Sequence, residues 1–215
     1  MADREKTYTT VPGLNMGLFA PHDLEQIITL IRKYDVPMAK VTSAQRLALF
    51  GMDKKQMDQF REDIDQYMKT PATNGVSFVQ ACPGAKWCKY GVRNTLDLKQ
   101  QLEQLSLAHP LPSKVKVSVA GCRMCCTSPK VRDLGFVASK KGWSLYFGGN
   151  GGNHPRIGDE IGSGLREQEV FDLAEKCLIL YGNEARKNTR TARFMERFGI
   201  EKIRKHLCSG AGQQQ

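Results

Sequence analysis

The chain has 215 residues, 40% of them hydrophobic and 25% charged, so it can bury one substantial core or two small packed units. No apolar run is long enough to span a bilayer and the N-terminal residues are charged, so we expect no transmembrane helix, no signal peptide and a soluble cytoplasmic protein. The net charge of +10 calls for an anionic partner or cofactor. The basic residues are dispersed and form no zinc-finger, RNA-recognition or basic-zipper pattern, which argues against nucleic acid as that partner.

The first third of the chain alternates strand and helix patterns. A strand is predicted at 8–11, a helix from Pro21, a strand at 36–42, an apolar run at 47–50, and a second helix capped by Asp53. Each helix carries an apolar stripe that we expect to pack in a core: Leu24, Ile27, Ile28, Ile31 and Tyr34 in the first, and Met57, Phe60, Ile64 and Tyr67 in the second.

The middle of the chain reads as strands that lead into cysteines. Residues 76–80 form a short strand before Cys82, and a helix is predicted at 96–105. Residues 114–120 alternate, with Val115, Val117 and Val119 on one face and Lys114, Lys116 and Ser118 on the other. Continued past the strand, the lysine-bearing face is also that of Cys122.

The last third is predicted to hold a hairpin followed by helices. The strands are 134–138 and 143–147, and a glycine-rich loop, 148–153, follows with a backbone that can approach a ligand closely. Two helices, 167–181 and 184–207, are expected to complete the chain.

Five of the seven cysteines lie in residues 81–129, four of them as Cys82-x5-Cys88 and Cys122-x3-Cys126. In a reducing compartment such pairs are more often metal or cluster ligands than disulfides. An iron–sulfur cluster fits the wide, unequal gaps better than structural zinc, which prefers shorter knuckles, although zinc and uncommitted cysteines remain alternatives. Cys125 breaks the pairing, Cys177 fits a buried helical position, and Cys208 has no assigned role.

The two cysteine pairs, with Gly121 before the third cysteine, resemble the signature of sirohaem nitrite and sulfite reductases. Residues 40–51, 111–122 and 142–152 resemble the same family, 184–199 resemble its assimilatory nitrite reductases, and the length resembles the small assimilatory-type sulfite reductases of anaerobes. The resemblance implies an α+β fold with a ferredoxin-like half domain at 1–72, a sirohaem and [4Fe–4S] α/β domain at 73–165, and C-terminal helices at 166–215 packing on the core.

The resemblance also implies a [4Fe–4S] cluster held by Cys82, Cys88, Cys122 and Cys126 and joined through Cys126 to the iron of sirohaem. The eight carboxylates of sirohaem would account for the positive charge. The side chains expected to bind this cofactor are Arg93, Arg123, Lys130, Arg132, Asn150 and Arg156.

The activity implied is six-electron reduction of sulfite to sulfide, with nitrite reduction to ammonia, or a non-catalytic electron carrier, as alternatives. Lys114 and Lys116 resemble the family's anion site, and Lys40 and Arg46 match further basic positions. The chain departs from larger relatives by having Ser77 and Phe78 where they carry an arginine. It also contains one copy of a module that they contain twice, so a homodimer is a hypothesis.

No glycine-rich dinucleotide fingerprint follows a predicted strand, so electrons are expected from an external donor such as ferredoxin. We expect neither nucleic acid nor a membrane as a partner.

Overall fold

The computed structural model describes residues 8–15, 19–42, 45–67 and 74–209. The chain divides into two compact units, Met1–Pro71 and Ala72–Gln215, and each is described by itself. Within the described residues no helix is both long and apolar enough to cross a membrane.

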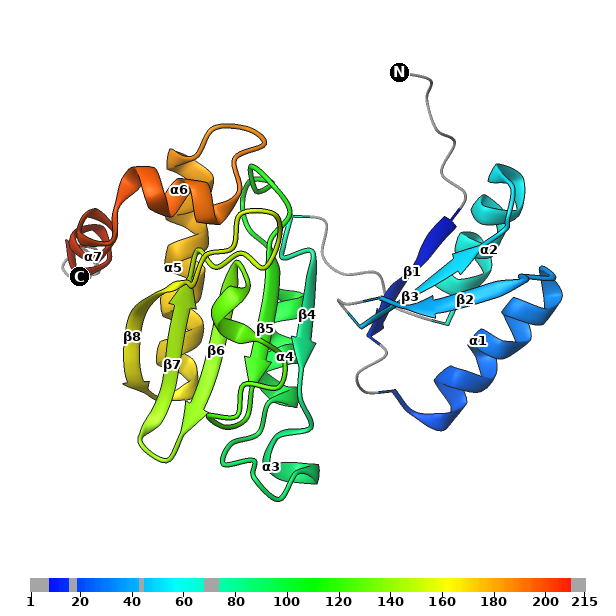
Figure 1. Cartoon of the computed structure of the whole chain (residues 1–215), viewed down its shortest axis with the longest axis horizontal. Coiled ribbons are helices and arrows are strands. Elements are labelled where there is room, and N and C mark those ends of the chain that lie inside the picture. Colours follow the sequence, from blue (N-terminus) through cyan, green and yellow to red (C-terminus); the bar gives the residue numbers. More distant parts are fainter. Residues whose placement is uncertain (1–7, 16–18, 43–44, 68–73, 210–215) are drawn as a thin grey trace. The chain divides into compact units, whose positions relative to one another are not determined.

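The first unit packs two helices on a small antiparallel sheet. Its elements are β1 (Tyr8–Asn15), α1 (Pro21–Lys33), β2 (Met38–Val41), β3 (Arg46–Phe50) and α2 (Lys54–Asp65), with strand order β1-β3-β2 (Figure 1). Asp53 caps α2 as predicted, because its carboxylate accepts a hydrogen bond from the Gln56 amide at 2.8 Å. Ile27, Leu49 and Phe60 are buried in the core, whereas Ile28 and Tyr67 are 37% and 55% exposed, so the predicted stripes were too wide.

The second unit is built on a five-stranded mixed sheet of order β4-β5-β6-β7-β8. The strands are β4 (Phe78–Ala81), β5 (Lys116–Ala120), β6 (Leu134–Ser139), β7 (Gly142–Phe147) and β8 (Asp159–Leu165). β4, β5 and β6 are mutually parallel, and the remaining pairs are antiparallel. The helical segments are α3 (Gly84–Trp87), α4 (Leu96–Gln104), η1 (Pro129–Val131), α5 (Glu167–Glu184), α6 (Thr191–Phe198) and α7 (Ile200–Ser209).

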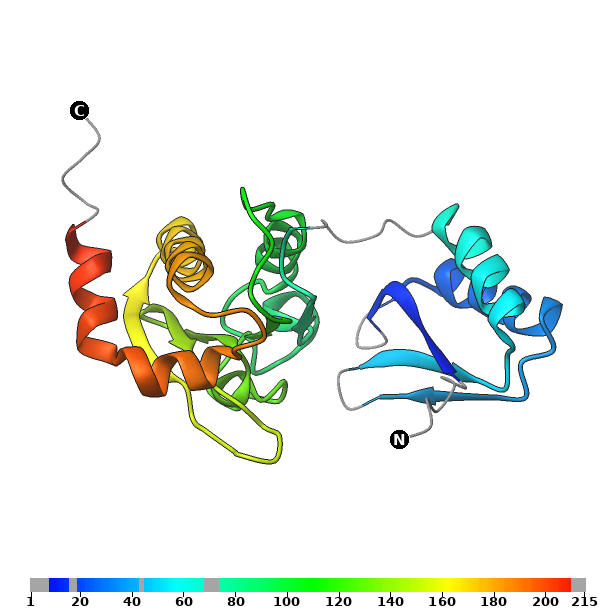
Figure 2. The same cartoon turned by 90° about the horizontal axis from the view of Figure 1, so that it is seen from above.

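The two faces of this sheet differ in chemistry. Val79, Val117, Val119 and Phe136 are buried in one apolar core with residues of α4 and α5, and these helices lie on the same side of the sheet (Figure 2). The opposite face carries Gln80, Lys116 and Ser118, and residues 121–133, including η1, cross it between β5 and β6. The apolar face of the sheet packs in the core, and the polar face carries the side chains of the candidate site described below.

The C-terminal third differs from the sequence prediction in two places. The expected helix at 184–207 is two helices, α6 and α7, because Gly199 lies between them with a φ of +86° and residues 185–190 are not helical. β8 was not predicted, because its sequence contains two glycines and an irregular burial pattern instead of clean alternation. The hairpin of β6 and β7 is confirmed.

Candidate cofactor and anion site

The first cysteine pair lies in a short loop at the carboxyl end of β4. The Cys82 amide donates to the Val119 carbonyl oxygen at 3.1 Å, which extends the pairing with β5 by one residue. Cys88 follows α3, and its amide donates to the Gly84 carbonyl oxygen at 2.9 Å. The Gly121 amide donates to Cys82 Sγ at 3.1 Å, which ties the first cysteine to the residue before Cys122.

Three glycines, Gly84, Gly91 and Gly121, allow close backbone contacts within and between the two cysteine loops. A Cβ at Gly91 would lie 2.3 Å from the Gly84 carbonyl carbon, and a Cβ at Gly121 would lie 2.8 Å from the Gly84 Cα. The Val92 amide donates to the Gly121 carbonyl oxygen at 2.8 Å across the same contact. A side chain at Gly91 would clash within the first loop, and a side chain at Gly121 would separate the two loops, so glycine is required at both positions.

The second pair lies in a tight loop that returns over the polar face of the sheet. The buried Ser118 hydroxyl donates to the Thr127 carbonyl oxygen at 2.8 Å, and the Thr127 hydroxyl donates to the Val119 carbonyl oxygen at 3.3 Å. Since Ser118 and Lys116 are two residues apart on one strand face, Thr127 lies about 7 Å along the strand from Lys116. Cys126 is exposed and directly precedes Thr127, so in the chain it lies between Cys122 and the point where the loop is tied to β5.

Cys125 occupies a left-handed backbone conformation, with a φ of +53°, inside this loop. Burial raises the pKa of its thiol; Lys130 lowers that pKa and Cys122 and Cys126 raise it, so the three sulfurs are electrostatic neighbours. Cys177 is buried in the apolar core, as predicted, and burial raises its pKa to about 12.

The predicted cysteine ligands do not form a metal-binding geometry in this structure. Within the described ranges, no three histidine, cysteine or acidic side chains are grouped closely enough to hold a metal ion. Nevertheless, the local arrangement fits a cluster. The four predicted cysteines lie on two loops held together by glycine contacts, and an amide already donates to Cys82 Sγ, a kind of hydrogen bond that tunes iron–sulfur clusters.

Two cavities lined by cations lie beside these loops; the first has apolar walls, whereas the second is mostly polar and also includes Glu160. One, of about 570 Å³, is lined by Cys122, by the apolar Tyr90, Val92 and Met124, and by Arg123, Lys140 and Lys141. The other, of about 530 Å³, is lined by Cys125 and includes Arg123, Lys130, Lys141 and Tyr146. Both volumes lie in the range of ligand pockets, and the mixture suits a flat macrocycle with carboxylate arms. Arg123 lines both cavities and Lys130 lines the second; their role as sirohaem contacts stays a prediction.

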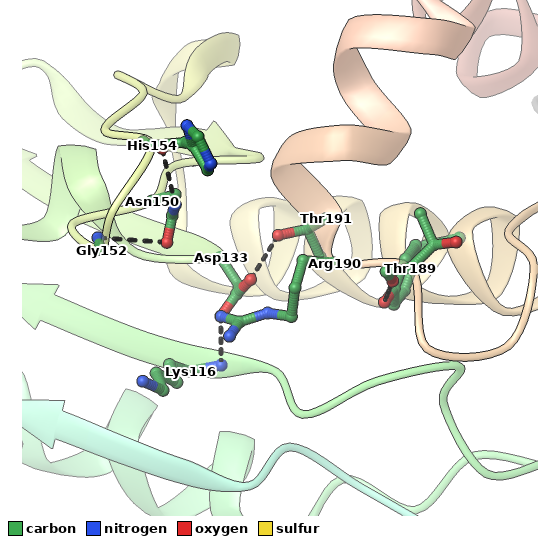
Figure 3. Close-up of polar contacts among 9 residues, drawn as sticks. Lys116, Asp133, Asn150, Gly152, His154, Thr189, Arg190 and Thr191 are labelled. Carbon is green, nitrogen blue, oxygen red and sulfur yellow. Dashed lines mark hydrogen bonds and ion pairs between the residues drawn. The ribbon is translucent and has the colours of Figure 1, made fainter.

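Three other residues that were predicted to bind the cofactor make hydrogen bonds or ion pairs to groups of the protein itself. Arg93 Nε donates to the Ser139 carbonyl oxygen at 3.0 Å. Arg156 donates to the Gly148 carbonyl oxygen at 3.0 Å and forms an ion pair with Asp159 at 2.6 Å. Asn150 closes its own loop, donating to the His154 carbonyl oxygen at 2.7 Å and accepting from the Gly152 amide at 3.3 Å (Figure 3). These contacts give all three residues structural roles.

Lys116 lies in a cationic cluster at the amino end of β5. Its backbone amide donates to Asp133 Oδ2 at 2.9 Å, and its side chain is half-buried (Figure 3). Desolvation lowers the pKa of Lys116, as do the positive charges of Arg190, Arg132 and Lys114, while Asp133 raises it. Lys114 is exposed and precedes β5. Arg132 donates to Gln80 Oε1 at 3.3 Å on the same face of the sheet.

Sequence reasoning missed Arg190, Asp133 and Thr191. Asp133 is 1% exposed and accepts from Arg190 at 2.6 Å and from the Thr191 hydroxyl. These residues are distant from Lys116 in sequence. A signal was present, since Asp133 is an acidic residue directly before a buried strand and therefore needs a partner.

The remaining predicted cations, Lys40 and Arg46, belong to the first unit. Lys40 is exposed on β2, and the register pairs it with Ala48 of β3, which places Lys40 and Arg46 as diagonal neighbours on one sheet face. Burial lowers the pKa of Arg46. Leu47 and Leu49 pack with the helices, so the two cations lie on the face without helices.

Residues 72–214 match the family model described as the nitrite and sulphite reductase 4Fe-4S domain. The chain belongs to this family. The match begins and ends within one residue of the bounds of the second unit, and it includes every cysteine on the two loops. Family membership implies sirohaem together with a [4Fe–4S] cluster.

The chain is 39% identical over 198 residues to an assimilatory-type sulfite reductase of Nitratidesulfovibrio vulgaris, covering 92% of this chain and 91% of that protein. It is 33% identical over 209 residues to an NAD(P)H nitrite reductase of Bacillus subtilis, covering 95% of this chain but 25% of that protein.

Two solved structures have a similar fold. The NirA protein of Mycobacterium tuberculosis has a TM-score of 0.77 at 15% identity, covering 94% of this chain and 40% of that one. Dissimilatory sulfite reductase I has a TM-score of 0.78 at 12% identity, covering 94% of this chain and 68% of that one. The α+β fold predicted from the sequence is confirmed.

Proposed function

We propose that the chain reduces sulfite to sulfide with six electrons at a coupled sirohaem–[4Fe–4S] centre. The observation that carries this proposal is the extent of the likeness. The chain covers 91% of an assimilatory-type sulfite reductase at 39% identity, whereas it covers only 25% of an NAD(P)H nitrite reductase. Nitrite reduction to ammonia is therefore the second candidate.

In this proposal Cys82, Cys88, Cys122 and Cys126 hold the cluster. Cys126 is exposed and directly precedes Thr127, which is tied to β5, and we propose it as the cysteine that joins the cluster to sirohaem. When bound, the cofactors would pass electrons from an external donor to the substrate and supply the metal at which S–O bonds break. Arg123, Lys130 and Arg132 pair with sirohaem carboxylates, since the first two line cavities beside the cysteine loops.

The protein's own task is to bind an oxyanion and deliver protons as its oxygens leave as water. Lys114 and Lys116 supply positive charge to the substrate. Lys40 and Arg46 of the first unit are proposed as further anion contacts only from their match to basic positions of the family. Lys116 is the best proton donor among them, because its lowered pKa brings its ammonium group closer to the working pH.

The test uses the full chain, purified without oxygen with its cofactors bound. Sirohaem should give a Soret band and a red-region band, and sulfite should oxidise reduced viologen dye with release of sulfide. Turnover of nitrite alone would select the second candidate. A protein with both absorption bands that oxidises the dye with neither anion would be an electron carrier, and the proposed function would be wrong.

An external protein of the ferredoxin type is proposed as the electron donor. A chain of charge +10 attracts an acidic donor, and raising the salt concentration screens that attraction. Donor-dependent turnover should therefore fall severalfold as salt rises, while dye-dependent turnover changes little. Equal salt responses with the two donors would remove the electrostatic part of this proposal.

A homodimer is proposed as the assembly in which a second copy of the module completes the site. Light scattering of the cofactor-loaded protein should then give twice the chain mass of 24.1 kDa. A monomer with full sirohaem occupancy would contradict it. The cytoplasmic location predicted from the sequence stays a prediction.

A further inference from the structure

Asp133 joins three parts of the second unit at one buried carboxylate. Its Oδ2 accepts the backbone amide of Lys116 at 2.9 Å and the Arg190 guanidinium at 2.6 Å, and its Oδ1 accepts the Thr191 hydroxyl (Figure 3). Lys116 begins β5, Asp133 precedes β6, and Thr191 begins α6. The carboxylate therefore fixes the start of α6 beside the lysine end of β5.

The charge of this cluster is not balanced by Asp133. Arg190, Arg132 and Lys114 all act on Lys116 as positive charges, so this lysine has three cations and one carboxylate, Asp133, as electrostatic neighbours. Phe78 of β4 is the register partner of Lys116, and its side chain carries no charge. The positive charge beside the lysine comes instead from Arg190, which directly precedes α6. A half-buried group of like charges is costly unless an anion joins it.

The cluster also contains donors without acceptors. The Nε atoms of Arg132 and Arg190 are buried and, among the residues that the structure describes, neither has a hydrogen-bond partner. Buried guanidinium N–H groups are ordinarily satisfied, and an unmet donor is an opening for a ligand acceptor. Two such donors beside a half-buried lysine favour a compact ligand with several negatively charged oxygens.

We propose that Arg190 is an anion-binding residue of the oxyanion site, acting with Lys116 and Arg132, and that Asp133 is the positioning residue that holds Arg190 there. The ligand class is a small inorganic oxyanion. The inference rests on the proposed function for the identity of that anion as sulfite. The cluster, however, exists in this chain whatever the reaction is.

Arg190→Gln removes the charge and the guanidinium fork, and Arg190→Lys keeps the charge and the ion pair with Asp133 while losing the fork. Arg193→Gln is the matched control. It removes an arginine from α6, the helix that Arg190 directly precedes, where Arg193 pairs with Glu196 on the surface. Asp133→Asn tests positioning, because it keeps an acceptor for Thr191 but removes the charge that holds Arg190.

Two measurements are made on the full cofactor-loaded chain. The first is the KM and kcat for sulfite with a dye donor; Arg190→Gln should raise KM by roughly tenfold or more, with a smaller change in kcat, and Asp133→Asn should change KM in the same direction. The second needs no turnover. Inorganic sulfate should raise the melting temperature of the parent chain and of Arg193→Gln, and this rise should be lost in Arg190→Gln.

The outcomes separate the two proposals. If the parent chain reduces neither anion but sulfate still stabilises it through Arg190, the proposed function fails and the anion site stands. If sulfite is reduced but Arg190→Gln behaves like Arg193→Gln in both measurements, the anion site is overturned and the function stands. Should Arg190→Gln fail to fold, Arg190→Lys decides the matter. A parent-like KM and sulfate response in that variant would overturn the role of the fork.

Discussion

The hydroxyl of Ser118, buried in the middle of β5, donates a 2.8 Å hydrogen bond to the carbonyl oxygen of Thr127. This contact fixes the residue after Cys126 over the polar face of the sheet. It therefore connects the two ends of the site, because Ser118 lies between the lysine end of β5 and the cysteine loop at the other end. The position of Cys126 depends on a side chain that is not itself a candidate ligand.

Ser118→Ala should loosen this loop. The change leaves the Thr127 carbonyl oxygen without its partner, and a lost buried hydrogen bond of this kind costs about 1–3 kcal/mol of unfolding free energy. We expect a lower melting temperature and a lower sirohaem content, read from the Soret absorbance per chain. Ser106→Ala, at an exposed position, is the control. Full sirohaem content in the Ser118 variant would show that Cys126 is positioned by other contacts.

Gly91→Ala should distort the first cysteine loop, in which Gly91 packs directly on the backbone of Gly84. Its Cβ would lie 2.3 Å from the Gly84 carbonyl carbon, so the backbone must move, at a cost of about 1–3 kcal/mol. Iron and sulfide content should fall together with stability. Gly152→Ala is the matched control, because its nearest contact is 3.4 Å away at the end of the Asn150 side chain. Normal cluster content in the Gly91 variant would mean that the first cysteine loop does not need this close contact to hold its ligands.

Much of this fold could be predicted from local patterns. The alternation of Val117 and Val119 predicts β5, and Asp53 predicts the start of α2. The contacts that organise the site could not be predicted in this way. Asp133, Thr191 and Lys116 are brought together by the packing of α6 against the sheet, and no short-range pattern contains that information. Gly199, with a φ of +86°, divided a helix that apolar periodicity alone makes continuous.

The cysteines should separate into two groups by substitution with serine. Loss of Cys82, Cys88, Cys122 or Cys126 removes a proposed ligand, and we expect loss of most cluster iron in each case. Cys125→Ser should retain the cluster, although Cys125 is adjacent to Cys126. Iron, acid-labile sulfide and visible absorption are the measurements. Cys177→Ala provides a control at a buried site away from the loops. Loss of the cluster in the Cys125 variant, with retention in the Cys126 variant, would reverse the assignment of the fourth ligand.

The pH dependence of turnover should report the ionisation of Lys116. Its pKa lies below the ordinary 10.5 because of desolvation first and then the charges of Arg190, Arg132 and Lys114, against the opposing charge of Asp133. The ammonium group is therefore lost at a lower pH than in a free lysine. We expect kcat/KM for sulfite to fall as pH rises through that pKa, below 10.5.

Stability should change in the opposite direction in the same window. Between the folded pKa of Lys116 and 10.5 the unfolded chain binds more protons at this side chain, so its contribution to the free energy of unfolding rises with pH. Lys116→Arg keeps the positive charge at all these pH values and should move the alkaline fall of kcat/KM upward. Lys202→Arg, at an exposed position on α7, should leave the profile unchanged. An alkaline fall that is identical in the Lys116→Arg variant and the parent chain would assign it to another group.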